Sequence, residues 1–234
     1  MQLRFISLFV LCFLFFGCFQ DKSKLRGNLK LPPYEDLIAE VESQRLAFQK
    51  EYANADEATQ NTIEEKAQSY LLKKITHDFF DQWYGTEWDF NGTTRTPRIG
   101  KIACGYFITT VLLDAGFKIP RVKWAQQASE YYITRMTSEV KRFSGKTPEY
   151  MKGYFMDQPD GLFVAGLDSH VGFVYKSGKK VTFTHASYYD PEVGVQTEEL
   201  DGDNPFAKSA YRVVGRILTK EMIRKWILDE SWSV

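Results

Sequence analysis

Apolar residues recur at helical spacing between Tyr34 and Trp83, which predicts a mainly helical segment. The triplet Asn54-Ala55-Asp56 interrupts the pattern and divides the segment into two helices, with Asp56 suited to cap the second. The apolar stripe of the second helix consists of Ile63, Ala67, Tyr70, Leu71, Ile75, Phe79 and Trp83. His77 lies off this stripe and is expected at the surface. Residues 34–83 therefore read as a helical extension in which no chemistry is visible.

A second helical pattern runs from Ile102 to Phe117, with Cys104 at its start. Its apolar residues include Phe107, Val111 and Leu112. A thiol at a helix N-terminus lies among unpaired backbone N–H groups, which lowers its pKa and favours the nucleophilic thiolate. The alternative is a small buried hydrophobic residue, which is what most free cysteines are.

The segment at about 121–160 follows this helix and is expected to be an inserted helical segment. An apolar face at helical spacing predicts one long helix from Val122 to Phe143. The pair Thr147-Pro148 is typical of an N-cap and first turn, and predicts a second, short helix. Because the insertion lies between Cys104 and the histidines that follow, we expect it to form one wall of a cleft.

From Gly161 onward the pattern changes to strands. One short strand is predicted at 161–165, and the segments 170–175 and 180–185 flank a hairpin turn. If Ser177 and Gly178 are the turn residues, His170 pairs directly with His185, whereas a longer loop would shift this register. A last strand at 211–218 precedes a C-terminal helix that Thr219 is suited to cap. The sequence predicts an α+β fold in which the Cys104 helix packs on an antiparallel sheet.

Residues 1–18 read as an export signal. Arg4 precedes an almost wholly apolar run that ends at Gly17-Cys18 and is shorter than the roughly 20 residues a spanning helix needs. The sequence around Cys18 resembles a bacterial lipobox, in which the cysteine is lipidated and becomes the new N-terminus. A soluble secreted protein and an uncleaved anchor are the alternatives. Residues 19–33 are polar with a Pro-Pro pair, which suits a short tether.

Composition and charge limit the classes of function that the chain can have. The chain has 234 residues, of which 44% are hydrophobic, enough for a substantial core. Thirty basic and thirty acidic residues balance to a formal net charge of zero, so no basic excess points to nucleic acid. No cysteine and histidine cluster has the spacing of a zinc site, and no metal or cofactor is implied.

Cys104, His170 and His185 are the candidate catalytic residues. The other two cysteines lie in the first twenty residues, so Cys104 has no evident disulfide partner if that segment is removed. A cysteine on a helix, a histidine on a strand and a polar group that orients the histidine are the parts of a thiol acyl-transfer site. Cys104 would attack a carbonyl carbon, His170 would act as base and acid, and His185 would orient His170.

At these residues the sequence also resembles the NlpC-type family of cell-wall cysteine peptidases, which are papain-like and cleave peptidoglycan stem peptides. The resemblance covers residues 84–218. Three segments carry it: the loop at 84–95, the segments 118–121 and 125–127 after the Cys104 helix, and the histidine strands with His170-Val-Gly-Phe-Val, Phe183-Thr-His-Ala-Ser187 and Gly194-Val195.

The resemblance implies a papain-like catalytic domain at 84–234 and assigns Cys104 as nucleophile, His170 as base and His185 as the third residue. It further implies that Trp88, Gly105 and Ser187 contact the substrate. The family usually has Asp-Cys-Ser-Gly at the nucleophile, where this chain has Ala103-Cys104-Gly105-Tyr106. A tyrosine that the family places near the oxyanion falls at Trp88, which has no hydroxyl.

The expected function is hydrolysis of amide bonds in peptidoglycan stem peptides from a lipid-anchored position in the cell envelope, facing the periplasm or the exterior. The partners are then the stem peptides and, through the anchor, a membrane. An amidase or acyltransferase that uses Cys104, His170 and His185 is one alternative. The other is a non-catalytic envelope lipoprotein that binds wall peptides.

Overall fold

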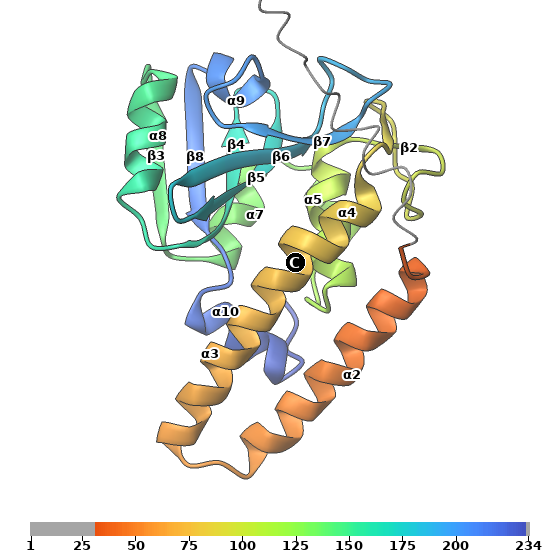
Figure 1. Cartoon of the computed structure of the whole chain (residues 1–234), viewed down its shortest axis with the longest axis vertical. Helices are drawn as coiled ribbons and strands as arrows, with labels where there is room; N and C mark the ends of the chain where they lie inside the picture. Colours follow the sequence, from red (N-terminus) through yellow and green to blue (C-terminus); the bar gives the residue numbers. More distant parts are fainter. Residues whose placement is uncertain (1–30, 233–234) are drawn as a thin grey trace, which may run out of the picture. The chain divides into compact units, whose positions relative to one another are not determined.

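The computed structural model describes residues 31–232. In it the helical extension is a hairpin whose second arm continues through a π-helix into a short α-helix (Figure 1). Its elements are α2 (Tyr34–Ala53), α3 (Glu57–Lys73), η1 (Lys74–Phe79) and α4 (Phe80–Trp83). The predicted break at residues 54–56 is confirmed, and the Asp56 side chain accepts a hydrogen bond from the backbone N–H of Thr59 at 2.9 Å. His77 is exposed, as expected.

A six-stranded antiparallel sheet forms the centre of the fold, in the order β3-β8-β4-β5-β6-β7. Its strands are β3 (Val140–Ser144), β4 (Gly161–Leu167), β5 (Val171–Ser177), β6 (Lys180–Ala186), β7 (Val195–Glu199) and β8 (Tyr211–Arg216). A separate parallel pair consists of β1 (Glu87–Trp88) and β2 (Lys101–Ile102). The α+β class with an antiparallel sheet is therefore confirmed.

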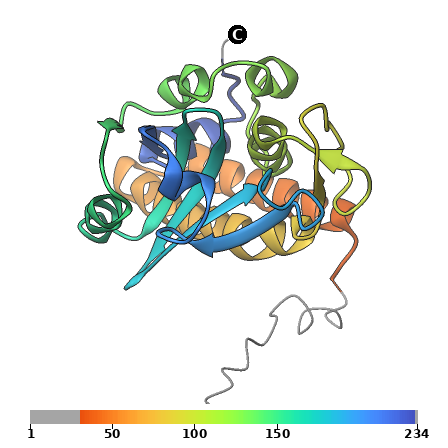
Figure 2. The same cartoon turned by 90° about the horizontal axis from the view of Figure 1, so that it is seen from above.

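Two apolar clusters lie on opposite faces of this sheet. On one face, Phe107 of α5 (Cys104–Asp114) packs edge-on against Phe173 of β5, with ring centroids 5.8 Å apart. On the other face, α8 (Pro148–Met156) and α9 (Pro205–Lys208) pack through aromatic contacts of Phe155 and Phe206. In the view of Figure 2, α2 and α3 lie beyond the sheet. The sheet thus separates the α5 side from the α8 side.

The prediction of one long helix from Val122 to Phe143 is wrong. The segment instead forms α6 (Arg121–Ala125), α7 (Ser129–Met136) and strand β3. Met136, Val140 and Phe143 are spaced for one face of a helix, but in β3 Val140 and Phe143 stand on opposite faces of the sheet and pack against different apolar clusters. Pairing of β3 with β8 supplies the backbone hydrogen bonds that decide in favour of the strand. The short helix after Thr147 is confirmed, with the Thr147 side chain accepting from Tyr150 N–H.

The predicted register of the β5–β6 hairpin is also wrong. Ser177 pairs with Lys180, so the two turn residues are Gly178 and Lys179. Gly178 has a φ of +55°, which a primed hairpin turn requires at its first central position. The Asp160 carboxylate accepts hydrogen bonds from Gly178 N–H at 3.0 and 3.1 Å and from Lys176 Nζ at 2.5 Å. This contact comes from outside the hairpin and holds the turn one residue later than predicted.

The C-terminal part follows the expected order. The last strand is confirmed as β8, and α10 (Lys220–Ile227) begins after Thr219, whose side chain accepts from Met222 N–H at 3.4 Å. Strand β7 and helix α9 were not predicted. The described residues from Pro32 onward form one unit, so the helical extension is continuous with the rest of the fold.

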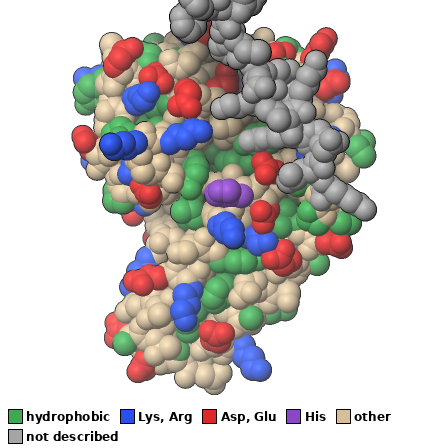
Figure 3. Space-filling model, viewed as in Figure 1, with side chains coloured by type: hydrophobic (Ala, Val, Ile, Leu, Met, Phe, Trp, Pro, Cys, Tyr) green, Lys and Arg blue, Asp and Glu red, His purple; other side chains and the backbone are tan. Residues whose placement is uncertain are grey.

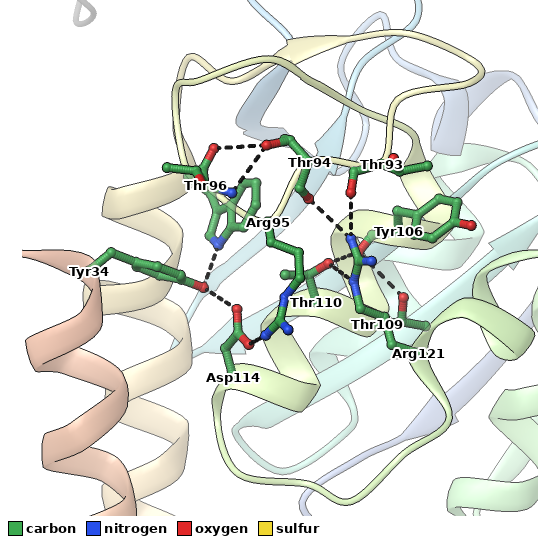
Figure 4. A network of polar contacts seen from close by, with 11 residues as sticks. Tyr34, Thr93, Thr94, Arg95, Thr96, Tyr106, Thr109, Thr110, Asp114 and Arg121 are labelled. Carbon is green, nitrogen blue, oxygen red and sulfur yellow. Dashed lines mark hydrogen bonds and ion pairs between the residues drawn. The ribbon is translucent and has the colours of Figure 1, made fainter.

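A polar network ties the start of α2 to the end of α5 (Figure 4). The buried carboxylate of Asp114 accepts hydrogen bonds from Tyr34 Oη at 2.9 Å and from the Arg95 guanidinium at 2.7 Å. The indole N–H of Trp83 donates to Tyr34 Oη at 2.9 Å. Arg121 Nε donates to Thr110 Oγ1 at 2.7 Å and its guanidinium reaches the carbonyls of residues 93 and 94. The loop before β2 is thereby fixed to α5.

The export signal at 1–18 and the tether up to residue 30 lie outside the described residues, so Cys18 has no structural account. Within residues 31–232, none of the helices is both long and apolar enough to cross a membrane. On the face drawn in Figure 3, acidic and basic side chains are interspersed.

Candidate active site

Cys104 is the first residue of α5, as the sequence predicts. The preceding residue, Ala103, is extended and makes no side-chain cap, so the first backbone N–H groups of the helix have no capping side chain. The Cys104 thiol is free and partly buried. The backbone N–H groups of Cys104, Gly105 and Val171 all face its sulfur. The thiol therefore lies between the start of α5 and the start of β5.

A pocket of about 440 Å³ lies beside this thiol. Cys104 and Gly105 contribute from α5, and residues 167–171 contribute from the connection between β4 and β5. Tyr211 and Val213 contribute from β8. The remaining wall comes from the α6–α7 region, between Ala125 and Tyr132. Part of the inserted segment thus lines the same pocket as Cys104 and His170.

The pKa of the Cys104 thiol is raised, contrary to the expectation from its place at a helix start. Burial raises this pKa, and the backbone N–H groups of Val171, Gly105 and Cys104 itself oppose the effect without cancelling it. Loss of hydration penalises the thiolate more than the helix terminus stabilises it. The resting protein therefore holds a neutral thiol at neutral pH.

The imidazoles of His170 and His185 are hydrogen-bonded, with 2.8 Å between His170 Nε2 and His185 Nδ1. Both side chains are buried, at 5% and 0% exposure. Burial, and after it the charge of His185, holds the pKa of His170 well below its usual range. His170 is therefore neutral at neutral pH and has a nitrogen lone pair with which to accept a proton.

His170 and His185 do not pair directly as predicted. The observed register places Gly172 opposite His185, and His170 lies just before the first residue of β5. The two histidines are diagonal neighbours on one face of the hairpin. The predicted contact is thus present, but the predicted pairing behind it is wrong.

Glu198 is a further member of this arrangement that the sequence analysis missed. Its carboxylate Oε2 lies 2.6 Å from His185 Nε2. Glu198 is on β7, where it pairs with Phe183, so it too is diagonal to His185. The sequence signal is a carboxylate three residues after Val195, the apolar first residue of the strand, and it does not distinguish Glu198 from the neighbouring Glu199.

The pleat of the sheet separates the histidines from most of α5. His185 and Phe183 stand on the face that bears α8 and α9, whereas Phe173 and α5 belong to the other face. His170 lies at the end of the sheet, where it lines the Cys104 pocket and also contacts His185. The hydrogen bonds of residues 31–232 do not include one between Cys104 and His170. Catalytic hydrogen bonds are often long before substrate binds.

Of the three residues expected to contact substrate, Gly105 alone lines the pocket. A Cβ at Gly105 would lie 2.7 Å from the carbonyl oxygen of Ala125, so α5 and α6 approach too closely for a side chain there. Trp88 packs on Tyr188, which in turn packs on His170, with ring centroids 5.9 and 5.1 Å apart. Ser187 is fully buried and its hydroxyl accepts from Asp190 N–H at 3.3 Å. Trp88 and Ser187 thus lie behind the histidines and not in the pocket.

Comparisons with models of known protein families, with curated proteins and with solved structures each found no match. Among the side chains described, no group of three or more His, Cys, Asp or Glu residues is placed to hold a metal ion. The functional argument therefore rests on the geometry of the pocket.

Proposed function

We propose that the protein is a papain-like thiol hydrolase of amide bonds, with Cys104 as nucleophile and His170 as general base and acid. One observation carries the proposal: Cys104, at the start of α5, and His170, backed by His185, line the same pocket. A nucleophile, a base and a group that orients the base are the minimum for covalent acyl transfer.

The reaction begins with a neutral thiol and a neutral imidazole. His170 takes the Cys104 proton while the sulfur attacks the carbonyl carbon, and the C=O electron pair moves onto oxygen. As the tetrahedral intermediate collapses, the C–N bond breaks and His170 gives its proton to the leaving amine. Water then attacks the thioester carbon and loses a proton to His170. The C–S bond breaks, which releases the carboxylic acid and leaves Cys104 as a thiolate. The proton returns to the Cys104 sulfur.

Because His170 Nε2 is engaged with His185, Nδ1 is the nitrogen left to accept the thiol proton. The backbone N–H groups at the uncapped start of α5 are suited to bind the oxyanion, since preformed donors in a site shielded from water stabilise developing charge most strongly.

Peptidoglycan stem peptides are the proposed substrate. The resemblance to the NlpC-type family over residues 84–218 supports this choice, and so does the export signal with its lipobox-like Cys18. A lipid anchor at Cys18 would hold the enzyme at a membrane of the cell envelope, where this substrate is found.

A non-catalytic lipoprotein that binds wall peptides is the second candidate. Two observations favour it: the raised pKa of the Cys104 thiol, and the absence of a Cys104–His170 hydrogen bond among the contacts of the described chain. An amidase or acyltransferase on another acyl group would use the same residues and differ only in substrate.

The deciding experiment incubates the full-length protein with purified peptidoglycan and analyses the products by mass spectrometry. Hydrolysis should yield new amine and carboxyl ends at one stem-peptide bond, and Cys104→Ala should abolish them. His77→Ala is the matched control, because His77 is exposed and outside the pocket. Stoichiometric binding of peptide without cleavage by the wild type would instead favour the binding lipoprotein.

A further inference from the structure

Glu198 makes a short hydrogen bond to the far side of the histidine pair. Its Oε2 lies 2.6 Å from His185 Nε2, and the His185 side chain is fully buried while that of Glu198 is 26% exposed. His185 is the sole ionic partner of Glu198 among the ion pairs of the described residues. The Glu198 carboxylate is thus available to interact with the His185 imidazole alone among these ion pairs.

The remaining surroundings of His185 are apolar or neutral. The Phe183 ring stacks on the imidazole with centroids 4.5 Å apart, and the same ring lies close against Gly172. The charged or titratable groups in contact with His185 are therefore His170 on one side and Glu198 on the other. No Lys or Arg of residues 31–232 forms an ion pair with Glu198, whereas the adjacent Glu199 lies 3.9 Å from Lys180 Nζ.

The row of hydrogen bonds from Glu198 through His185 to His170 determines which nitrogen donates and which accepts. An ionised carboxylate only accepts hydrogen bonds, so His185 Nε2 carries a proton. When that is its only proton, His185 has a lone pair on Nδ1, which accepts from His170 Nε2–H over 2.8 Å. A neutral His170 in turn has its lone pair on Nδ1. Without the carboxylate, the reverse tautomers become accessible, and His170 Nδ1 is then blocked by a proton.

We propose that Glu198 is a positioning residue that acts through His185 to keep the lone pair of His170 on Nδ1. This inference rests on the proposed function, because that nitrogen is the one that takes the Cys104 proton. Glu198 does not itself accept a proton during turnover. It orients the pair and stabilises the His170 imidazolium that forms when the thiol attacks.

The test compares Glu198→Ala and Glu198→Gln with Glu199→Gln, in the full-length protein. Glu199 is the next residue on the same strand and its side chain points to the other face, which makes it a matched control. Nitrogen-15 NMR of the imidazoles reports which nitrogen of His170 carries the proton. Hydrolysis of peptidoglycan and the pH profile of Cys104 alkylation report the chemistry, and thermal unfolding checks the fold.

In Glu198→Ala, we expect protonation of His170 Nδ1, little change in KM, and a fall in kcat smaller than the roughly 10²–10⁴-fold that general base catalysis contributes, because Glu198 acts through His185 and makes no bond itself. Glu198→Gln should keep the tautomer, because the amide oxygen still accepts from His185, and should lose less activity. Glu199→Gln should match the wild type in every measurement.

A folded Glu198→Ala variant with the wild-type tautomer and kcat would overturn the inference and leave the hydrolase intact. A wild-type protein that shows no Cys104-dependent hydrolysis would overturn the proposed function. The NMR comparison separates these cases, since the effect of Glu198 on the His170 tautomer is measurable without turnover.

Discussion

The rings of His170 and His185 meet at right angles, with centroids 4.9 Å apart, although the two residues are not cross-strand partners. The position opposite His185 is occupied by Gly172. A glycine there leaves room for the Phe183 ring, whose Cε2 lies 2.3 Å from the place of an added Cβ, and this ring stacks on the His185 imidazole. The packing around His185 thus depends on a residue with no side chain.

Gly172→Ala should therefore damage both fold and site. The added Cβ would lie 2.3 Å from Phe183 Cε2 and 3.0 Å from His185 Cβ. We expect a loss of about 1–3 kcal/mol in the free energy of unfolding, the usual cost of overpacking, together with reduced hydrolysis. Urea titration measures the first effect. Gly153→Ala on α8 is the control, because a Cβ there meets nothing within 4 Å, and it should gain about 0.5–1 kcal/mol.

Substitutions of the proposed catalytic residues should differ in severity. Cys104→Ala should remove essentially all turnover, because no other atom replaces the attacking sulfur. His170→Ala should lower kcat by about 10²–10⁴-fold, the range of general acid–base catalysis. His185→Ala should be milder, since it performs no bond-making step. Steady-state kinetics measures kcat for each variant, with His77→Ala as control. A fall in kcat for His77→Ala as large as that for His170→Ala would contradict this order.

Acid should destabilise the protein through His170. The folded state holds the His170 pKa well below that of the unfolded chain, so the unfolded chain binds an additional proton as pH falls. The contribution of His170 to the free energy of unfolding is therefore fully present above about pH 6.5. Below that pH it decreases, by at most about 1.4 kcal/mol per pH unit. His170→Leu should flatten the dependence measured by urea titration between pH 7 and 5. A variant with an unchanged slope would mean that another group dominates.

The same Tyr→Phe change should have opposite signs at two sites. Tyr132 has a buried hydroxyl with no hydrogen-bond partner, and its ring stacks on Trp124, so Tyr132→Phe should stabilise by about 1 kcal/mol. The hydroxyl of Tyr34 joins Trp83 to Asp114, so Tyr34→Phe should destabilise by about 1–3 kcal/mol. Thermal unfolding of the two variants provides the comparison, and a loss in both would refute the assignment for Tyr132.

Alkylation should report the buried state of the thiol. Because burial raises the Cys104 pKa, iodoacetamide should react slowly at neutral pH and faster as pH rises beyond 8.5, about the value of a free cysteine. Mass spectrometry of the intact protein measures the rate. A fast reaction well below that pH would mean that the thiol is paired with His170 as an ion in solution. Reaction only after unfolding would favour the binding lipoprotein.

What could be predicted from the sequence was local. Asp56, Thr147 and Thr219 cap helices through hydrogen bonds to residues three positions later, and all three were found from spacing alone. The place of Cys104 at the start of α5 was also predicted from local spacing, that of the apolar residues that follow it.

What was missed depends on contacts between distant segments. β3 is a strand because β8 pairs with it, and the hairpin register is held by Asp160. Glu198 reaches His185 only because β7 pairs with β6. The raised pKa of Cys104 results from burial by residues 125–132 and by the start of β5, which a helix-terminus argument does not include.

The two faces of the sheet carry different parts of the proposed site. The pocket wall at 125–132 lies on the α5 side with Cys104, whereas His185 and Glu198 stand on the side covered by α8 and α9. Only His170, at the sheet's end, belongs to both. Mutations that reshape the wall can therefore change which molecules enter the pocket without touching His185 or Glu198, and a new specificity can evolve while the proposed base stays unaltered.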